Sequence, residues 1–237
     1  MNWNVKDWNV KEMKIIAGTD FHGSRSAFEN FAVNSKRHEV DLAVICGDIT
    51  NFGTVEQAKN LLTMLAEINI PTIFVPGNCD PPSLVDLNLN GLTCIHGKLY
   101  VNSDLTFIGL GGGTVSPFNT FFEMREEEIA KILRRCAENL RENVRKVNLI
   151  FVSHTPPKNT RLDRTFMGVH AGSTSVRRFI EENRPLLTLC GHIHEARGVD
   201  RVGDTLVVNP GPAKQGNYAI VTIKGGEVNV ELRREEI

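Results

Sequence analysis

The chain has 237 residues, of which 41% are hydrophobic and 23% charged, and its formal net charge is −1. This length suits one large α/β domain with a substantial core, and the composition is ordinary for a globular protein. The near-neutral charge argues against a nucleic-acid partner, and no apolar run approaches the ~18–20 residues that a membrane span needs. We therefore expect neither nucleic-acid nor membrane association.

The five cysteines are odd in number and lack the CxxC spacing. They are expected to be reduced thiols, which is typical of intracellular proteins. Because no signal-peptide pattern opens the chain, the sequence predicts a cytoplasmic protein.

Residues 1–12 contain the unit Trp-Asn-Val-Lys twice and carry both tryptophans. Chain ends are usually poorly ordered unless they are tied down. Three interpretations stay open: a tail that results from an upstream start codon, an added edge strand, or an aromatic arm that docks on a neighbouring subunit. The predicted organisation is an N-terminal arm over 1–12 and a single domain over 13–237, with a homo-oligomer left open.

Five apolar runs along the chain are each followed by small residues and then by Asp, Asn or His. Such runs are typical of buried strands, and α/β folds present their chemistry at strand ends. One polar loop of this kind would be ordinary, but five indicate a joint metal site. The metal-competent residues that follow the runs are, in order, Asp20, His22, Asp48, Asn78, Asp80, His154, His192 and His194.

Helices are predicted between these runs. Residues 24–39 show a helical apolar face with Ser24 or Ser26 as N-cap, and residues 54–57 form a capping box at the start of a second helix. A charged helix is expected over about 123–144 and another over 173–183. The alternation of strand and helix predicts parallel pairing with right-handed crossovers.

The last third of the chain is predicted to be rich in strands. Short β segments occur around Val199, 206–208, 218–223 and 228–232. Their turn-separated, alternating pattern is typical of antiparallel strands. We expect them to complete a second sheet.

The glycine-rich run 109–113 has no Lys-Ser/Thr tail and does not open a helix directly, so it fits no nucleotide-binding loop. We expect it to mark a close approach of the backbone near the site. The aromatic residues from Phe118 to Phe122 are expected to pack in or cap the core, because so many exposed aromatics would be unusual. A wall that faces the substrate is the alternative.

A long irregular stretch runs from Thr155 to Gly172. Loops of this length inside a compact domain tend to be functional. Arg161, Asp163, Arg164 and His170 are candidates for contacting a substrate phosphate or its leaving group, since arginine suits bidentate phosphate contact. The alternative for each is a solvated loop residue.

Motifs spaced along the chain resemble, in residue type and order, those of the calcineurin-like metallophosphoesterase superfamily. They are Asp20-x-His22, Gly47-Asp48, Gly77-Asn78-x-Asp80, His154, Gly191-His192-x-His194 and Asn209-Pro210-Gly211. The match covers about residues 14–211. The resemblance implies a four-layer α-β-β-α sandwich of two mixed sheets with helices outside.

The resemblance also implies a dinuclear metal centre. The first ion would be held by Asp20, His22 and His194, and the second by Asn78, His154 and His192. The carboxylate of Asp48 would bridge the two ions. Such a centre hydrolyses phosphoesters by means of a metal-bridging hydroxide. Mixed nitrogen and oxygen ligands suit two divalent transition-metal ions, with manganese favoured and iron, nickel or zinc as alternatives.

Departures from the family pattern narrow the expected reaction. Many relatives carry His at the position of Cys79, held by the acidic neighbour and assisting the leaving group, and a thiol of pKa about 8.5 matches neutral proton transfer less well. The chain resembles small, mostly prokaryotic phosphodiesterases with a Gly-Asn-Cys-Asp motif. We therefore predict a phosphodiesterase that prefers small substrates with good leaving groups. Its catalytic residues are expected to be Asp48, Asn78, Cys79, Asp80 and His154.

Other activities stay open. A phosphomonoesterase or a nuclease of the same superfamily would use the same ligands. Some relatives are scaffolds that no longer catalyse a reaction, because fold alone does not fix function. All seven ligand positions hold competent residues here, which favours an enzyme.

Overall fold

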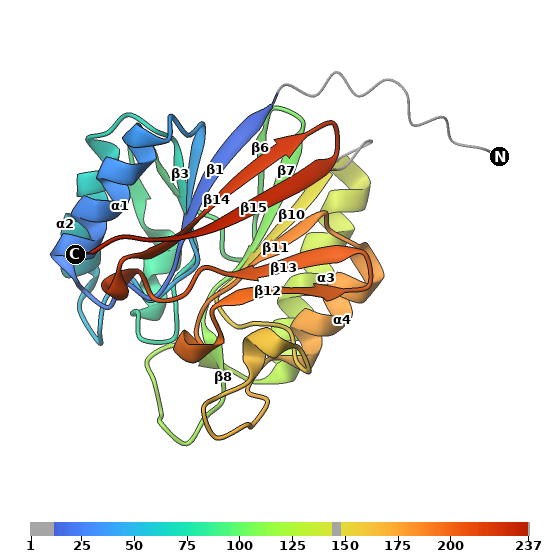
Figure 1. The fold of residues 1–237 in the computed structure, drawn as a ribbon. Coiled ribbons are helices and arrows are strands. Elements are labelled where there is room, and N and C mark those ends of the chain that lie inside the picture. Colours follow the sequence, from blue (N-terminus) through green and yellow to red (C-terminus); the bar gives the residue numbers. More distant parts are fainter. Residues whose placement is uncertain (1–11, 144–147, 237) are drawn as a thin grey trace.

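Two large β-sheets face each other in the computed structural model, which describes residues 12–143 and 148–236 (Figure 1). The predicted arm over 1–12 lies, apart from Glu12, outside the described residues, so its three interpretations remain predictions. Two helices cover the outside of each sheet. The predicted four-layer α-β-β-α sandwich of two mixed sheets is confirmed.

The first sheet has seven strands in the order β15-β14-β1-β2-β3-β5-β4. Its parallel strands are β1 (Met13–Gly18), β2 (Leu42–Ile45), β3 (Thr72–Phe74) and β5 (Leu92–Cys94). Antiparallel strands complete both of its edges: β4 (Asn88–Leu89), β14 (Asn217–Lys224) and β15 (Glu227–Arg234).

The second sheet has six strands in the order β12-β13-β11-β10-β7-β6. Its parallel strands are β7 (Leu105–Leu110), β10 (Asn148–Ser153), β11 (Leu187–Leu189) and β13 (Thr205–Asn209). Its antiparallel edges are β6 (Leu99–Asn102) and β12 (Gly198–Val202). A short parallel pair, β8 (Gly113–Thr114) and β9 (Glu123–Met124), lies apart from both sheets.

Three of the four described α-helices begin at predicted caps, and α3 begins at Glu126, where a start at about residue 123 was expected. Their bounds are α1 (Arg25–Arg37), α2 (Val55–Ala66), α3 (Glu126–Asn143) and α4 (Thr174–Asn183). Ser24 and Ser173 accept hydrogen bonds from the first turns of α1 and α4, and Thr54 forms the predicted capping box with Gln57. Short 3₁₀ helices are η1 (Pro82–Asp86), η2 (Arg161–Asp163), η3 (His194–Ala196) and η4 (Ala213–Gln215). None of the described helices has the length and apolar character needed to cross a membrane.

Apolar side chains fill three layers. Between the sheets, Ile15 and Val44 from the first sheet and Ile150 and Leu189 from the second belong to one fully buried cluster. A second cluster joins α1 and α2 to the first sheet, and a third joins α3 and α4 to the second. Because helices cover the outer face of each sheet, the central strands are buried on both faces.

The last strands divide between the two sheets, so the prediction that they all complete the second sheet was wrong for β14 and β15. β14 pairs antiparallel with β1, with Met13 opposite Ile223. Its side chains alternate between two cores: Tyr218 and Ile220 face the helices, and Val221 faces the other sheet. A strand buried on both faces can fit inside either sheet, and its sequence pattern alone does not select one.

The loops that follow β1, β2, β3, β10 and β11 meet at one end of the sandwich. Backbone hydrogen bonds join them: the Asp20 N–H donates to the Gly47 carbonyl, and the Gly191 N–H donates to the His154 carbonyl, both at 3.0 Å. His154 also reaches from the second sheet to the Cys46 carbonyl of the first, at 2.7 Å from Nδ1. Both sheets therefore contribute to one site.

Candidate metal centre

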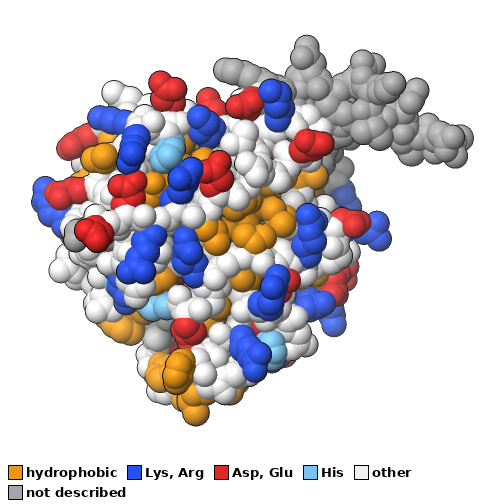
Figure 2. Space-filling view, viewed as in Figure 1, with side chains coloured by type: hydrophobic (Ala, Val, Ile, Leu, Met, Phe, Trp, Pro, Cys, Tyr) orange, Lys and Arg blue, Asp and Glu red, His pale blue; other side chains and the backbone are white. Residues whose placement is uncertain are grey.

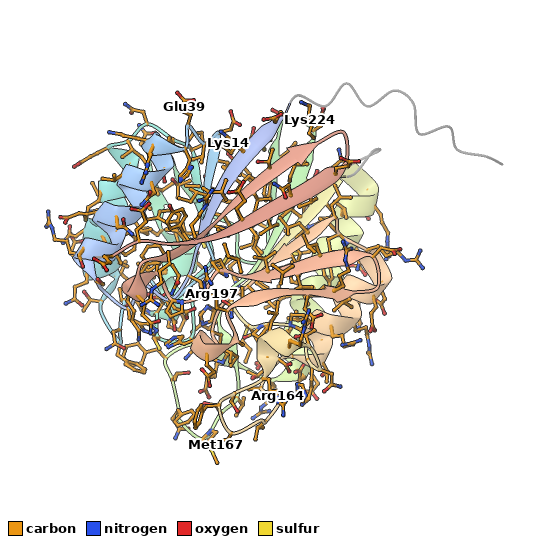
Figure 3. The ribbon with its side chains drawn as sticks, viewed as in Figure 1. Lys14, Glu39, Arg164, Met167, Arg197 and Lys224 are labelled. Atoms are coloured by element: carbon orange, nitrogen blue, oxygen red, sulfur yellow. The ribbon has the colours of Figure 1, made fainter. Side chains whose placement is uncertain are left out.

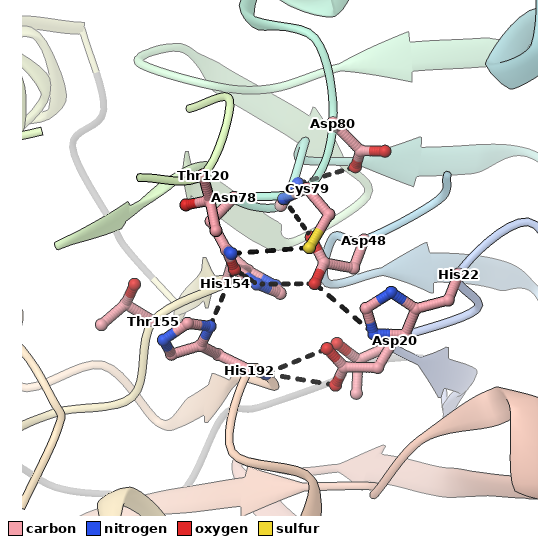
Figure 4. Close-up of polar contacts among 12 residues, drawn as sticks. Asp20, His22, Asp48, Asn78, Cys79, Asp80, Thr120, His154, Thr155 and His192 are labelled. Carbon is pink, nitrogen blue, oxygen red and sulfur yellow. Dashed lines mark hydrogen bonds and ion pairs between the residues drawn. The ribbon is translucent and has the colours of Figure 1, made fainter. Parts of the chain in front are cut away.

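All seven predicted ligands come together where these loops meet, and Figure 4 shows most of them. Each lies within hydrogen-bond or ion-pair distance of another member of the set. We call these seven residues the metal centre: Asp20, His22, Asp48, Asn78, His154, His192 and His194.

One half of the metal centre comes from the loop after β1 and from η3. The Nε2 atoms of His22 and His194 lie 3.0 Å apart, and His194 Nε2 lies 3.4 Å from Asp20 Oδ1. Asp20 is fully buried, and its carboxylate also accepts the His192 backbone N–H. Two ring nitrogens and a carboxylate oxygen thus surround one point, a donor set that suits a transition-metal ion.

The other half is built around the side-chain amide of Asn78. Its Oδ1 lies 2.9 Å from His154 Nε2 and 2.8 Å from His192 Nδ1. The His154 side chain is fully buried and Asn78 is 6% exposed. A neutral oxygen and two imidazole nitrogens again converge on one point.

Asp48 lies between the two halves. Its Oδ2 is 3.6 Å from His22 Nε2 and also 3.6 Å from His154 Nε2. Its other oxygen, Oδ1, accepts the Cys79 backbone N–H at 2.8 Å, which fixes the orientation of the carboxylate. One carboxylate therefore faces both groups of ligands.

The charges of the site fit bound cations. Asp20, Asp48 and Asp80 are at most 2% exposed, and among the described residues no lysine or arginine forms an ion pair with them. Burial, helped by the neighbouring carboxylates, raises the pKa of Asp48 to about 7. Buried carboxylates are costly unless a charge balances them, and divalent ions would supply that charge.

Two of the histidines are neutral, as metal binding requires, whereas the Asp48 and Asp20 carboxylates outweigh burial and raise the pKa of His154, so that a bound ion would have to displace its Nε2 proton. Burial lowers the pKa of His22 to about 4 and that of His192 to about 3, so both rings are neutral at pH 7 with a lone pair available. For His154, the contact between Nδ1 and the Cys46 carbonyl requires a proton on Nδ1. Nε2 is then the atom that would act as a ligand, an arrangement typical of metal-binding histidines.

The backbone of the metal centre is held in an unusual conformation. Asp20, His22, Asp48 and His192 have φ values of 56°, 48°, 52° and 70°. This left-handed region is uncommon for residues other than glycine, and each such residue costs about 1–3 kcal/mol. Four of the seven ligands therefore depend on the surrounding fold to keep their side chains aimed at one another.

Two glycines, for which the sequence analysis gave no structural reason, permit the close packing of this backbone. A Cβ at Gly77 would lie 2.1 Å from Asp48 Oδ1, and one at Gly191 would lie 1.8 Å from Thr19 Oγ1 and 2.9 Å from Asp20 Oδ2. Gly113 approaches Asn78 closely as well, which confirms the prediction for the glycine run. The glycines that precede ligands in the sequence are therefore required sterically.

Asp80 and Cys79 lie beside the metal centre but have different surroundings. The carboxylate of Asp80 accepts the N–H groups of Ile49, Thr50 and Gly77 at 2.7–3.0 Å, together with the Thr50 hydroxyl. It therefore braces the loops that carry Asp48 and Asn78. Cys79 is 7% exposed, and its Sγ lies within 4.8 Å of the ligand atoms of His22 and Asp48. Burial raises the pKa of this thiol, which stays protonated.

A further residue supports the loop with the paired histidines. Asn209 is fully buried; its Nδ2 donates to the Ile193 carbonyl at 2.9 Å and its Oδ1 accepts the Gly211 N–H. Ile193 lies between His192 and His194, so Asn209 fixes their loop. The Asn-Pro-Gly motif in the sequence was the signal for this role.

A cavity of about 1270 Å³ opens beside the metal centre. His170 lines it together with Asn78, His192 and His194, and its Nδ1 lies 2.7 Å from the fully buried Asp163. Asp163 also accepts the N–H groups of Asn159, Thr160 and Gly172, so it fixes both the long loop and the histidine ring.

The two arginine candidates are placed differently from His170. The backbone N–H of Arg161 donates to Asp200, and its guanidinium donates to the Val199 carbonyl and lies 3.5 Å from Asp200. The backbone of Arg164 pairs with that of His170 in an isolated antiparallel β-bridge, and Arg164 is exposed (Figure 3). Neither arginine lines the cavity. A phosphate-binding role for them remains a prediction.

The aromatic loop does not pack as expected. Phe118 is 82% exposed and Phe121 is 49% exposed, so the prediction of core or cap packing was wrong for both; Phe122 is partly buried against the third core cluster. Exposed apolar residues also occur at 165–170, across the same cavity. We call the segments 114–122 and 165–170 the apolar loops.

Comparison with known proteins gives consistent results. The sequence profile of the family described as "Metallophosphoesterase, calcineurin superfamily" matches residues 50–232. An uncharacterized protein of Methanocaldococcus jannaschii is 39% identical over 210 residues, covering 86% of this chain and 90% of that protein. A Vesicomyosocius okutanii protein named "Probable cyclic nucleotide phosphodiesterase" is 26% identical over 218 residues, which is 90% of this chain and 86% of that protein.

Solved structures share the fold. A crystal structure of a Thermus thermophilus protein superposes with a TM-score of 0.73 at 20% sequence identity. The similarity covers 93% of this chain and 99% of that one. At this level of identity the likeness concerns the fold alone.

Proposed function

Because the chain belongs to the calcineurin superfamily of metallophosphoesterases, we propose that it hydrolyses phosphodiesters with good leaving groups, using two divalent transition-metal ions. The seven residues of the metal centre would hold these ions, with Asp48 shared between them. Manganese is the metal we favour, on the mixed nitrogen and oxygen donors.

The observation that carries this proposal is the central position of Asp48. Its Oδ2 is equally distant, at 3.6 Å, from a histidine of each ligand group. A single ion would be held by one ligand group and would leave the other ligand group buried without a bound cation. Two ions bound there would lower the pKa of a coordinated water and neutralise charge on the phosphate oxygens.

The chain's own residues would orient the reaction. Asn78 supplies a neutral oxygen, which limits the negative charge that an incoming phosphate meets. His170 has its Nδ1 held by buried Asp163, so Nε2 remains to carry a proton at the cavity wall. We assign to His170 the protonation of the leaving group, a role for which the Cys79 thiol is poorly suited, since burial raises its pKa and makes it a weak acid.

A diester is favoured over a monoester for two reasons. The cavity leaves ample room for a second substituent on phosphorus. The name of one relative, a cyclic nucleotide phosphodiesterase, also concerns a diester. Cyclic nucleotides therefore belong among the first substrates to test.

The test compares bis(4-nitrophenyl) phosphate, 4-nitrophenyl phosphate and 3′,5′-cyclic AMP as substrates, after chelator treatment and reloading with Mn²⁺, Ni²⁺, Fe²⁺ or Zn²⁺. Elemental analysis should find two ions per chain. We expect metal-dependent cleavage that favours a diester. A preference for the monoester would replace this proposal with a phosphatase, and two bound ions without turnover of any ester would favour a scaffold.

A further inference from the structure

The exposed apolar side chains of this protein gather around one cavity. Among the described residues, nine large hydrophobic side chains are exposed, and seven of them lie at the mouth of the metal centre. The seven are Phe52, Val115, Phe118, Phe121, Phe166, Met167 and Val169. Single exposed apolar residues are normal, whereas a contiguous group marks a site of interaction.

These side chains face the cavity from two sides. Phe118 comes from one apolar loop, and Phe166 and Met167 come from the other, with exposed fractions of 82%, 93% and 87%. Both loops project from the same end of the molecule, and apolar side chains gather there in Figure 2. Phe52 contacts Phe121 edge-on, with ring centroids 5.2 Å apart, and joins the first loop to the metal centre. The patch is thus continuous with the site.

The cavity is larger than the proposed reaction centre requires. Its volume of about 1270 Å³ exceeds the range of about 300–1,000 Å³ that is usual for pockets of small ligands. A phosphodiester group would fill only the part beside His192 and His194. The rest, between the apolar loops, is available to a substituent of the phosphate.

Several polar groups of the apolar loops are already bonded within the protein. The hydroxyl groups of Ser116 and Thr120 both donate to Glu123, at 2.7 and 2.8 Å. The N–H of Phe166 donates to Glu195, and the Thr165 hydroxyl accepts the Val169 N–H. These groups are not free to pair with the edge of a nucleobase, and the side chains exposed beside them are apolar, so the tips of the two loops favour an aliphatic chain.

We propose that the physiological substrate is an amphiphile: a phosphodiester with one long aliphatic substituent, which the two apolar loops hold between them. The proposal rests on the phosphodiesterase function above and names its substrate class. Burial of the chain against Phe118, Phe166 and Met167 would supply the binding energy, while the metal centre acts on the phosphate.

The test uses a matched pair of esters, dodecyl 4-nitrophenyl phosphate and methyl 4-nitrophenyl phosphate, below the critical micelle concentration. Both release the same leaving group. We expect kcat/KM to be at least about tenfold higher for the dodecyl ester, a factor that burial of about two methylene groups supplies. Calorimetric titration of the metal-free protein should also show tighter binding of dodecyl phosphate than of methyl phosphate.

Variants locate the effect. The triple substitution F118S/F166S/M167S should reduce the dodecyl-to-methyl ratio of kcat/KM to near one. The matched control is V33S/V101S, which alters two side chains that are 63% and 60% exposed elsewhere on the surface. The control should keep the ratio of the wild type.

The outcomes separate the two proposals. Equal turnover of both esters would contradict the proposal of an amphiphilic substrate and would leave the proposed phosphodiesterase function standing. Selective binding of dodecyl phosphate without turnover of either ester would support the apolar site and contradict the proposed reaction. If the triple variant keeps the ratio but no longer sediments with phosphatidylcholine vesicles, the loops dock on membranes and the inference is wrong.

Discussion

Four of the seven residues of the metal centre are buried and the other three are partly buried, whereas side chains at the tips of the apolar loops are almost completely exposed. Asp20 and His154 are fully buried, while Phe166 beside the same cavity is 93% exposed. The first region is fixed by the ends of strands in two sheets, and the second by irregular loops. We infer from this difference that the reaction depends on the geometry at the strand ends, and substrate choice on loops that the fold constrains little.

The largest effect is expected from Asp48→Asn. The amide keeps the shape but loses the charge that faces both ligand groups, so kcat/KM for a diester should fall by about 10³-fold or more. Elemental analysis should find fewer than two ions per chain. Asp104→Asn, an exposed carboxylate, is the control. An unchanged metal content would contradict the bridging role.

Asp80→Ala should act on stability instead. It removes the acceptor of three backbone N–H groups and one hydroxyl, all buried. We expect the free energy of unfolding to fall by about 3–4 kcal/mol. Urea denaturation of the metal-free protein measures this, again beside Asp104→Ala. A loss below about 1 kcal/mol would show that the loops around the centre do not depend on this brace.

His170→Gln tests whether the cavity wall takes part in the reaction. If His170 protonates the leaving group, kcat should fall about 10²-fold for an alkyl leaving group and much less for 4-nitrophenol, which leaves without protonation. Equal losses for both leaving groups would assign His170 a positioning role only.

Whereas His170→Gln removes an imidazole, Cys79→His adds one on the buried side of the site. About a tenfold gain on poor leaving groups is expected, because imidazole matches proton transfer near neutral pH. The measurement is the dependence of kcat/KM on the pKa of the leaving group. A rate that stays the same or falls would show that Cys79 serves packing.

The smallest effect concerns Glu126, which joins α3 to the start of α4 beside the apolar loops. Burial raises the pKa of its carboxyl, but hydrogen bonds from Ser175, Ser173 and Thr174 outweigh burial, and the pKa lies below the usual 4.5. The carboxylate therefore stabilises the fold fully above about pH 4.5, and this contribution is lost as the pH falls through the lowered pKa.

Glu126→Gln should thus lower the free energy of unfolding at pH 7 by about 1 kcal/mol. The difference from the wild type should shrink as the pH falls below 4.5, the usual value for this carboxyl. Thermal unfolding measured between pH 7 and pH 3 checks this. A difference that does not depend on pH would mean that the charge of Glu126 is not involved.

The sequence predicted that the seven candidate ligands would lie together, because strand ends follow from the apolar pattern and side chains at such ends meet at one edge of a sheet. It did not predict that Phe118 and Phe121 would be exposed, since aromatic loop residues are normally expected to be buried. The sheet that contains β14 could not be assigned because its two buried faces fit either sheet. Likewise, the spacing of Asp80 could not show that backbone N–H groups surround it.

The separation of the ligands along the chain has a consequence for folding. His22 and His194, whose ring nitrogens lie 3.0 Å apart, are 172 positions apart in sequence. Closing so long a loop has a large entropic cost, which many contacts of the sandwich must offset before the ligands meet. Ions bound at this site could therefore not nucleate folding as zinc does in a small finger domain. During synthesis His194 follows β11, so it can meet His22 only after strands of both sheets have been made.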